Sequence, residues 1–420
     1  MSSIKKKIYF ERSEKQGSRK ERFLIPKGNK VLAKRGSYMD YASTTPVDPR
    51  VFRAMSPYFT EKFGNAMSLH GFGQEAKEIL EESRESVASL IGAKPDEIVF
   101  TGSATESNNL AVKGIAFANK KKGNHIIISQ IEHPCIMESV KWLEKEGFEI
   151  NRVGVDKYGL VNPESVSKLI KKETILVSII HASNEIGTIQ PIREIGKICR
   201  GNGVYFHTDA AQSFGKIPID VNKMNIDLLS ASSHKMYGPK GAALLYVREG
   251  VKIEPILHGG GQEAGLRSST VNIPAIAGFA EACSICKKEM KGESQRLKIL
   301  RDKLIKGILK KIPDSYLNGH PEKRLPNNAN FRFDFIEGES MVIRLDSLGI
   351  SVSTGSACSS VKLEPSHVLL ATGLKHEQAH GSLRVTLGRW TTKSDVNYFL
   401  KVLPPIIEKL RDISPFKKHA

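Results

Sequence analysis

Cysteines are few in this chain of 420 residues, and no apolar run is long. Scattered cysteines argue against a disulfide framework or a paired zinc ribbon; the five are Cys135, Cys199, Cys283, Cys286 and Cys358. The longest apolar run, 175–180, has strand length and falls far short of the roughly 20 residues of a membrane helix. No apolar block follows the lysines at 5–7, so no secretory signal is predicted. We therefore expect a cytoplasmic protein without a membrane span.

Three short motifs suggest other chemistry and are set aside. Cys283 and Cys286 form a CxxC, but they lie in an Ala- and Glu-rich stretch that is typical of a helix with a buried face. The segment HEQAH at 376–380 matches a zinc protease motif, yet it is short and Gly381 follows it at once. HGGG at 258–261 has no accompanying G-x-S-x-G, as a lipase requires. We predict no metal site.

The net charge of +18 is unevenly distributed. Residues 1–38 contain 12 Lys and Arg against 3 Glu, which is +9, or half of the excess in a tenth of the chain. Such an extension can bind nucleic acid or an acidic partner through its charge. No aromatic-interleaved RNA-binding motif accompanies it, so a solvated extension with at most an accessory nucleic-acid contact is the favoured interpretation.

Short β-rich runs alternate with longer amphipathic stretches after the basic extension. The runs are rich in Val, Ile and Leu, as expected for strands that are covered on both faces. They occupy 97–100, 125–129, 175–180, 204–209, 227–232 and 242–247. This alternation predicts an α/β fold with a large, mainly parallel sheet domain at 39–275. A long helical stretch and the strands at 328–335 and 382–388 predict a smaller α+β domain at 276–420.

Ligands of open α/β sheets bind beyond the carboxyl ends of the strands, so the polar residues there are the candidates. Ser103 and Glu106 follow the first strand in a capping-box spacing. The start of that helix suits a phosphate group, although a plain helix cap is an equal alternative. Asp209 ends an otherwise apolar strand. It would pair with a protonated pyridine nitrogen, or else cap the next helix.

Two potential nucleophiles lie further along the chain. Lys235 follows a strand, beside Ser232, Ser233 and His234 and before a Gly-Pro turn. A desolvated lysine there suits Schiff-base chemistry, and the alternative is a surface lysine. Cys358 lies in a Ser- and Gly-rich segment at 353–366, where a thiol is more typically reactive than structural.

Together these four segments offer a phosphate-binding helix start, a partner for a pyridine nitrogen, a lysine for a Schiff base and a reactive cysteine. With them a family resemblance is evident. From MDYASTTPVDP near residue 39 to LRDISP near 415, the chain resembles the cysteine desulfurases of the class V aminotransferase family that build iron–sulfur clusters. The ordered motifs EHPCI, HASNEIG, HTDAAQS, SSHKMYGPKG, HGGGQEAGLRSST and STGSACSS carry it. The resemblance implies the fold of type I transferases that depend on pyridoxal phosphate (PLP), and a homodimer. It also implies conversion of L-cysteine to L-alanine.

The resemblance also implies roles for individual residues. Lys235 would hold the cofactor and shuttle protons, His133 would stack on its ring, and Cys358 would accept the sulfur as a persulfide. Further cofactor-binding residues would be Ala104, Thr105, Asp209, Gln212, Ser232, His234 and, from the other subunit, Thr270. Asn184 and Arg384 would bind the substrate carboxylate, since a guanidinium meets a carboxylate through two hydrogen bonds.

The resemblance leaves the sulfur acceptor open. An iron–sulfur scaffold and a tRNA-thiolation protein are both compatible with it, and Cys358 could ligate a transferred cluster. Selenocysteine lyase and a true class V aminotransferase remain as alternative functions. A mobile loop cysteine is not needed by an aminotransferase, so Cys358 favours desulfuration over that alternative.

Overall fold

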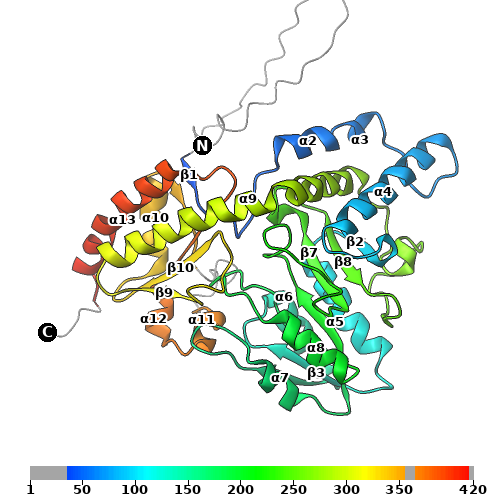
Figure 1. Ribbon diagram of the computed structural model, residues 1–420, viewed down its shortest axis with the longest axis horizontal. Coiled ribbons are helices and arrows are strands. Elements are labelled where there is room, and N and C mark those ends of the chain that lie inside the picture. The colour runs from blue at the N-terminus through cyan, green and yellow to red at the C-terminus, as the bar shows by residue number, and fades with distance from the viewer. Residues whose placement is uncertain (1–35, 355–364, 416–420) are drawn as a thin grey trace, which may run out of the picture.

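A computed structural model describes residues 36–354 and 365–415. Its main element is a seven-stranded sheet in the order β2-β8-β7-β6-β5-β3-β4, in which β8 alone runs against its neighbours (Figure 1). This confirms the mainly parallel α/β sheet. Since β2 and β7 both oppose β8 and the remaining pairs are parallel, six strands end at one edge: β2, β3, β4, β5, β6 and β7. The strands are β2 (Ile98–Thr101), β3 (His125–Ser129), β4 (Glu149–Val153), β5 (Thr174–Ser178), β6 (Tyr205–Asp209), β7 (Leu228–Ser232) and β8 (Ala243–Val247).

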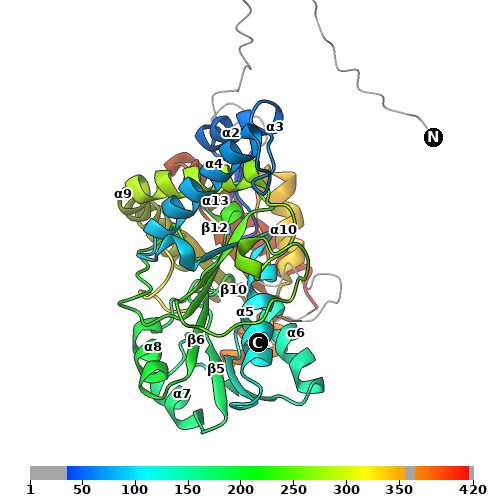
Figure 2. The same ribbon diagram turned by 90° about the vertical axis from the view of Figure 1, so that its right-hand side faces the viewer.

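Helices cover both faces of this sheet, so almost every residue of its central strands is buried. Figure 2 shows α5 and α6 on one side and α7 and α8 on the other. Leu110 and Ile136 pack on the first face, and Ile195 and Phe279 pack on the second. The helices of the two layers are α4 (Gly71–Ser89), α5 (Ala104–Ala118), α6 (Pro134–Lys145), α7 (Pro163–Leu169), α8 (Ile192–Gly201) and the first half of α9 (Ile273–Lys311).

A second, smaller part is built on an antiparallel sheet in the order β12-β10-β9. Leu304, Phe331 and Phe399 are at its core, between that sheet and the helices. Its elements are β9 (Ser315–Asn318), β10 (Asn328–Phe333), α10 (Gly338–Ser347), β11 (Ile350–Ser351), α11 (His367–Ala371), α12 (His376–His380), β12 (Ser382–Thr386) and α13 (Lys393–Asp412). β1 (Ser37–Tyr38) crosses over from the start of the chain and pairs with β11. The segment that follows β1 contains the short helices α2 (Pro49–Met55) and α3 (Pro57–Thr60).

Helix α9 belongs to both parts (Figure 1). It is 39 residues long, and its residues up to Cys286 pack in the core of the large sheet. From Leu297 onward they pack in the core of the small sheet. The helix therefore passes from one core to the other between Cys286 and Leu297. The sequence places the domain limits at 275 and 276, near the first turn of this helix, and these limits stay predictions. Residues 1–35 of the basic extension lie outside the described part.

The motifs set aside in the sequence have plain structural settings. Cys283 and Cys286 are both buried on the first half of α9. HEQAH forms the five-residue helix α12. In the described part of the chain, no helix is long and apolar enough to cross a membrane.

Candidate active site

The amine of Lys235 is held by a segment that the sequence did not single out. Lys235 ends a short 3-10 helix (Ser233–Lys235) directly after β7. Its Nζ donates to the carbonyl of Ala42 at 2.6 Å and to that of Ser43 at 2.7 Å. Gln212 Nε2 donates to the same Ala42 carbonyl at 2.9 Å. The residue expected to hold the cofactor and one expected to contact it therefore converge on one backbone oxygen.

Asp209 lies at the end of β6, in a polar chain that leads to His133. Its carboxylate accepts from Asn108 Nδ2 at 2.7 Å and from the backbone N–H of Ala211 at 2.9 Å. Asn108 Nδ2 also lies 3.1 Å from Cys135 Sγ, which is 3.0 Å from His133 Nδ1. Asp209 is buried, and no ion pair joins it to a lysine or arginine in the part of the chain that the structure describes. A buried carboxylate in this position suits a cationic ligand atom.

His133 is the N-cap residue of α6. Its Nδ1 accepts from the backbone N–H of Cys135, so a neutral ring carries its proton on Nε2. Burial lowers the pKa of His133, an effect that the charge of Asp209 opposes. The neighbouring Glu132 is also buried and raised in pKa to about 8 by desolvation. Its Oε1 accepts from Ser129 Oγ and from the backbone of Ile180, which anchors the turn before His133.

The helix start expected to bind phosphate has the predicted cap. Ser103 is the N-cap of α5 and accepts from the backbone N–H of Glu106 at 3.1 Å. The capping box does not close, because Glu106 instead accepts from the backbone of Gly102 and pairs with Arg267 at 2.7 Å. Ala104 and Thr105 form the first turn, where backbone N–H groups lack helical partners.

His234 and Ser232 occupy the end of β7 and the turn after it. His234 Nδ1 lies 3.1 Å from Thr44 Oγ1, and burial lowers its pKa to about 4. A neutral imidazole of this kind can donate one hydrogen bond to an anion. Ser232 is buried as the last residue of β7.

Arg384 extends from β12 of the small sheet toward the same segment. Its guanidinium donates to the carbonyl of Asn184 at 3.1 Å, to Asp40 Oδ1 at 3.0 Å and to Ser43 Oγ at 2.8 Å. The side chain is buried, and its Nε has no hydrogen-bond partner among the described residues. Arg384 therefore has an unused buried donor beside Lys235's own anchor, Ser43, as a substrate carboxylate would require.

Two predicted residues are not placed in this cluster. Thr270 is exposed and shares no hydrogen bond or ion pair with the cluster within the described ranges. Cys358 lies outside the described residues. Conversely, sequence reasoning missed Asp40, Ala42 and Asn108. MDYAST was noticed only as the start of the resemblance, since two of its contributions are backbone carbonyls.

The chemistry of this donor set fits pyridoxal phosphate. The amine of Lys235 can hold an aldehyde, the buried Asp209 can pair with a ring nitrogen, and the start of α5 can bind a phosphate. Asn108 Oδ1 is also buried without a partner among the described residues, so the neighbourhood has hydrogen-bonding capacity to spare.

Comparison with known proteins identifies the class. The model of the family Aminotransferase class-V matches residues 37–399. The chain therefore belongs to the class V aminotransferases, a family whose enzymes depend on pyridoxal phosphate.

Its relatives narrow the assignment further. The chain is 54% identical to cysteine desulfurase IscS of Dictyoglomus turgidum, over 92% of this chain and 98% of the relative. It is 55% identical to cysteine desulfurase IscS 1 of Archaeoglobus fulgidus, over 91% of this chain and all of the relative. A solved NifS-like protein has a TM-score of 0.84 at 39% identity and covers 89% of this chain and 100% of its own. Within its family the chain thus belongs with the cysteine desulfurases.

Proposed function

We propose that this chain is a cysteine desulfurase that converts L-cysteine to L-alanine and takes the sulfur on Cys358. The observation that carries the proposal is the convergence on segment 40–45. Its carbonyls hold the amine of Lys235, and its side chains hold Arg384. A cofactor-binding amine and a carboxylate-binding guanidinium are thereby fixed next to each other. A solved relative, SspA, was determined in complex with cysteine, with 38% identity and a TM-score of 0.76 over 85% of this chain and 100% of its own.

The side chains of this site divide the work. Pyridoxal phosphate, when bound through Lys235, supplies a sink for the electrons released at the substrate's α-carbon. Lys235 Nζ then takes up and returns protons at that carbon. Asp209 would pair with the ring nitrogen of the cofactor and so keep a positive charge on it. His133 covers the site as a neutral ring, with the proton on Nε2 available to the substrate.

The sulfur step belongs to Cys358. Its thiolate forms a sulfur–sulfur bond to the substrate as the substrate's own carbon–sulfur bond breaks. The electron pair of that bond stays with the substrate's β-carbon, which is then protonated. One thiol and one cysteine therefore become one persulfide and one alanine. The persulfide then passes to an acceptor, either an iron–sulfur scaffold or a tRNA-thiolation protein.

The test is sulfide and alanine release from L-cysteine with a thiol reductant, with the visible spectrum recorded alongside. A yellow protein that gives equal amounts of both products supports the proposal. A yellow protein that releases neither product, but acts on selenocysteine or transfers an amino group, favours one of the two alternative functions. A protein that cannot be made yellow by added pyridoxal phosphate contradicts the role of Lys235 and with it every step that depends on the cofactor.

Replacing Arg384 by lysine is expected to raise KM for L-cysteine about tenfold or more, with a smaller change in kcat. Lysine keeps the charge but loses the fork of N–H donors that binds a carboxylate through two bonds. Steady-state alanine release measures both constants. The control is Arg344→Lys on α10, which lies outside the site. A change confined to kcat, with KM as in the wild type, would contradict carboxylate binding.

We further propose that the chain works as a homodimer. Segment 59–72 has a cluster of exposed apolar side chains, and Leu69 is 92% exposed. The rings of Phe63 and Phe72 stack at 5.4 Å on the same surface. Such a patch is typical of a protein–protein interface. A second subunit would cover it, and Thr270 would serve the partner's cofactor site.

Leu69→Asp is therefore expected to shift the protein from dimer to monomer, since a carboxylate cannot be buried in an apolar interface without a partner. Sedimentation velocity measures the mass. Ile343→Asp is the matched control, because Ile343 is 70% exposed on α10 of the small part. A Leu69→Asp protein that stays dimeric would place the interface elsewhere.

A further inference from the structure

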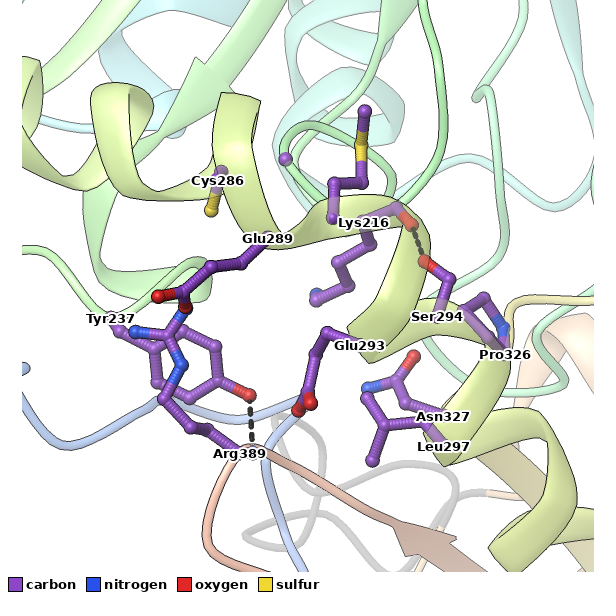
Figure 3. A pocket seen from close by; sticks show the side chains of 12 residues that line it. Lys216, Tyr237, Cys286, Glu289, Glu293, Ser294, Leu297, Pro326, Asn327 and Arg389 are labelled. Atoms are coloured by element: carbon purple, nitrogen blue, oxygen red, sulfur yellow. Dashed lines mark hydrogen bonds and ion pairs between the residues drawn. The ribbon is translucent and has the colours of Figure 1, made fainter.

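Lys216 is a partly buried lysine for which the proposed reaction has no use. It follows β6 on the turn that also carries Gln212. Figure 3 shows its side chain reaching into a pocket against α9, between Glu289 and Glu293 in that view. Tyr237, Cys286 and Arg389 also line this pocket. Burial of a charged amine costs free energy, so the position of Lys216 needs a structural explanation.

The acids of the pocket are already paired with arginines. Glu289 bonds to Arg50 at 2.6 Å and to Arg389 at 3.2 Å, and Glu293 bonds to Arg296 at 2.8 Å. No carboxylate forms an ion pair with Lys216 among residues 36–354 and 365–415. Salt-bridge formation therefore does not explain its position.

The contacts of Lys216 are with Gln212 instead. Its Nζ donates to the backbone carbonyl of Gln212 at 3.0 Å and lies 3.5 Å from Oε1 of the same residue. Burial, followed by the repulsion of Lys235, lowers the pKa of Lys216 to about 7. The charged and the neutral amine both have N–H groups for these two oxygens.

These contacts fix which way the Gln212 amide faces. Its Oε1 lies toward Lys216, and its Nε2 donates to Ala42, whose carbonyl also receives the amine of Lys235. In the flipped amide, Oε1 would face the Ala42 carbonyl and the NH₂ group would face the lysine amine. The contact with the Ala42 carbonyl would then be repulsive, as would the contact with a protonated Lys216, so the partners at the two ends select one orientation.

We propose that Lys216 is a positioning residue, which holds the Gln212 amide so that its NH₂ group faces the cofactor bound at Lys235. The inference rests on the proposed function and deepens it. An NH₂ group in that position donates to an anionic oxygen of the cofactor, whereas the flipped amide would repel it. Lys216 thus acts on the cofactor through Gln212, without touching it.

The groups that can influence this lysine electrostatically come from three directions. Lys235 lies toward the site, and Tyr237 and Arg389 lie at the side of the pocket. The groups of α9 are Cys286, Glu289 and Glu293. Removal of the Lys216 amine therefore leaves the pairing of the acids unchanged and takes away chiefly its two contacts with Gln212.

The test uses the full chain loaded with pyridoxal phosphate. Lys216→Met keeps the length of the side chain and removes its donors. We expect it to weaken cofactor binding about tenfold. We also expect a higher pH midpoint for the change in the bound cofactor's visible absorption, since the Gln212 NH₂ donor that favours the deprotonated form is no longer held toward the cofactor. Lys216→Arg should restore most of both. Lys223→Met is the control, because that lysine is exposed on the same connection between β6 and β7.

A double-mutant cycle separates positioning from a general effect of charge. If Lys216 acts through Gln212, adding Lys216→Met to Gln212→Leu should change affinity and midpoint no further. Additive effects, or a Lys216→Met protein with wild-type affinity and midpoint, would overturn the inference. Should the methionine variant not fold, Lys216→Ala also removes the donors and gives the same comparison, with a raised midpoint in support and a wild-type one against. A wild-type chain that binds no cofactor would instead count against the proposed function, from which this inference follows.

Discussion

Lys235→Ala is expected to produce a folded, colourless protein whose sulfide release falls by about 10³-fold or more. The amine is the group that can hold pyridoxal phosphate covalently, and it is also the proton carrier at the substrate's carbon. No other side chain at the end of β7 offers an amine, since the neighbours are serines and a histidine. Absorbance after incubation with the cofactor, together with alanine release, measures both losses.

The cost to stability should be much smaller than the cost to activity. Alanine leaves the carbonyls of Ala42 and Ser43 without the Lys235 donor, a loss of about 1–3 kcal/mol in the free energy of unfolding. Thermal unfolding of the apoprotein checks this. Lys240→Ala, at an exposed position in the same loop, should remain yellow and active. A Lys235→Ala protein that binds the cofactor with its usual colour would show that another residue carries it.

Cys358→Ser is expected to give the opposite combination, a yellow protein that releases almost no sulfide. The cofactor depends on Lys235 and Asp209, so its binding should be as in the wild type. A hydroxyl cannot take the place of a thiolate that must form a sulfur–sulfur bond, and turnover should fall on the order of 10³-fold. Cyanolysis of the protein after one turnover measures the persulfide directly.

The neighbouring Ser359→Ala serves as the control, because it alters the same segment and keeps the thiol. A colourless Cys358→Ser protein, or one that still desulfurates L-cysteine, would remove the role given to this cysteine. Retained activity on selenocysteine alone would favour the lyase alternative.

The residues that sequence reasoning found share one property. Asp209 is the last residue of a buried strand and Lys235 follows the next one, and a polar residue at such a place is visible without a structure. The strands themselves were predicted within a residue or two because they are buried on both faces. The edge strand β4 was missed, since Glu149–Val153 is mostly polar and only its last residue is buried.

Other parts of the site carry no local signal. Arg384 lies in an ordinary strand pattern, and its role came from resemblance alone. Ala42 contributes a carbonyl, which every residue has, so no sequence pattern reveals that it receives both Lys235 and Gln212. The role of α9 was hidden for a similar reason: a helical pattern shows that a face is apolar, but not which core that face enters.

The length of α9 has a consequence for how the molecule holds together. At 1.5 Å per residue, its 39 residues form a rod of about 58 Å, and each half of that rod is one wall of a different core. Unfolding of either half of α9 would expose the apolar side chains of the core that this half covers. It would also remove the helical hydrogen bonds at the junction with the other half. We therefore expect the two parts to unfold as one cooperative unit, and pieces cut near the helix not to fold independently. We expect a rigid link of this kind also to hold Lys235 and Arg384, which come from opposite parts, at a constant spacing while the substrate enters and leaves.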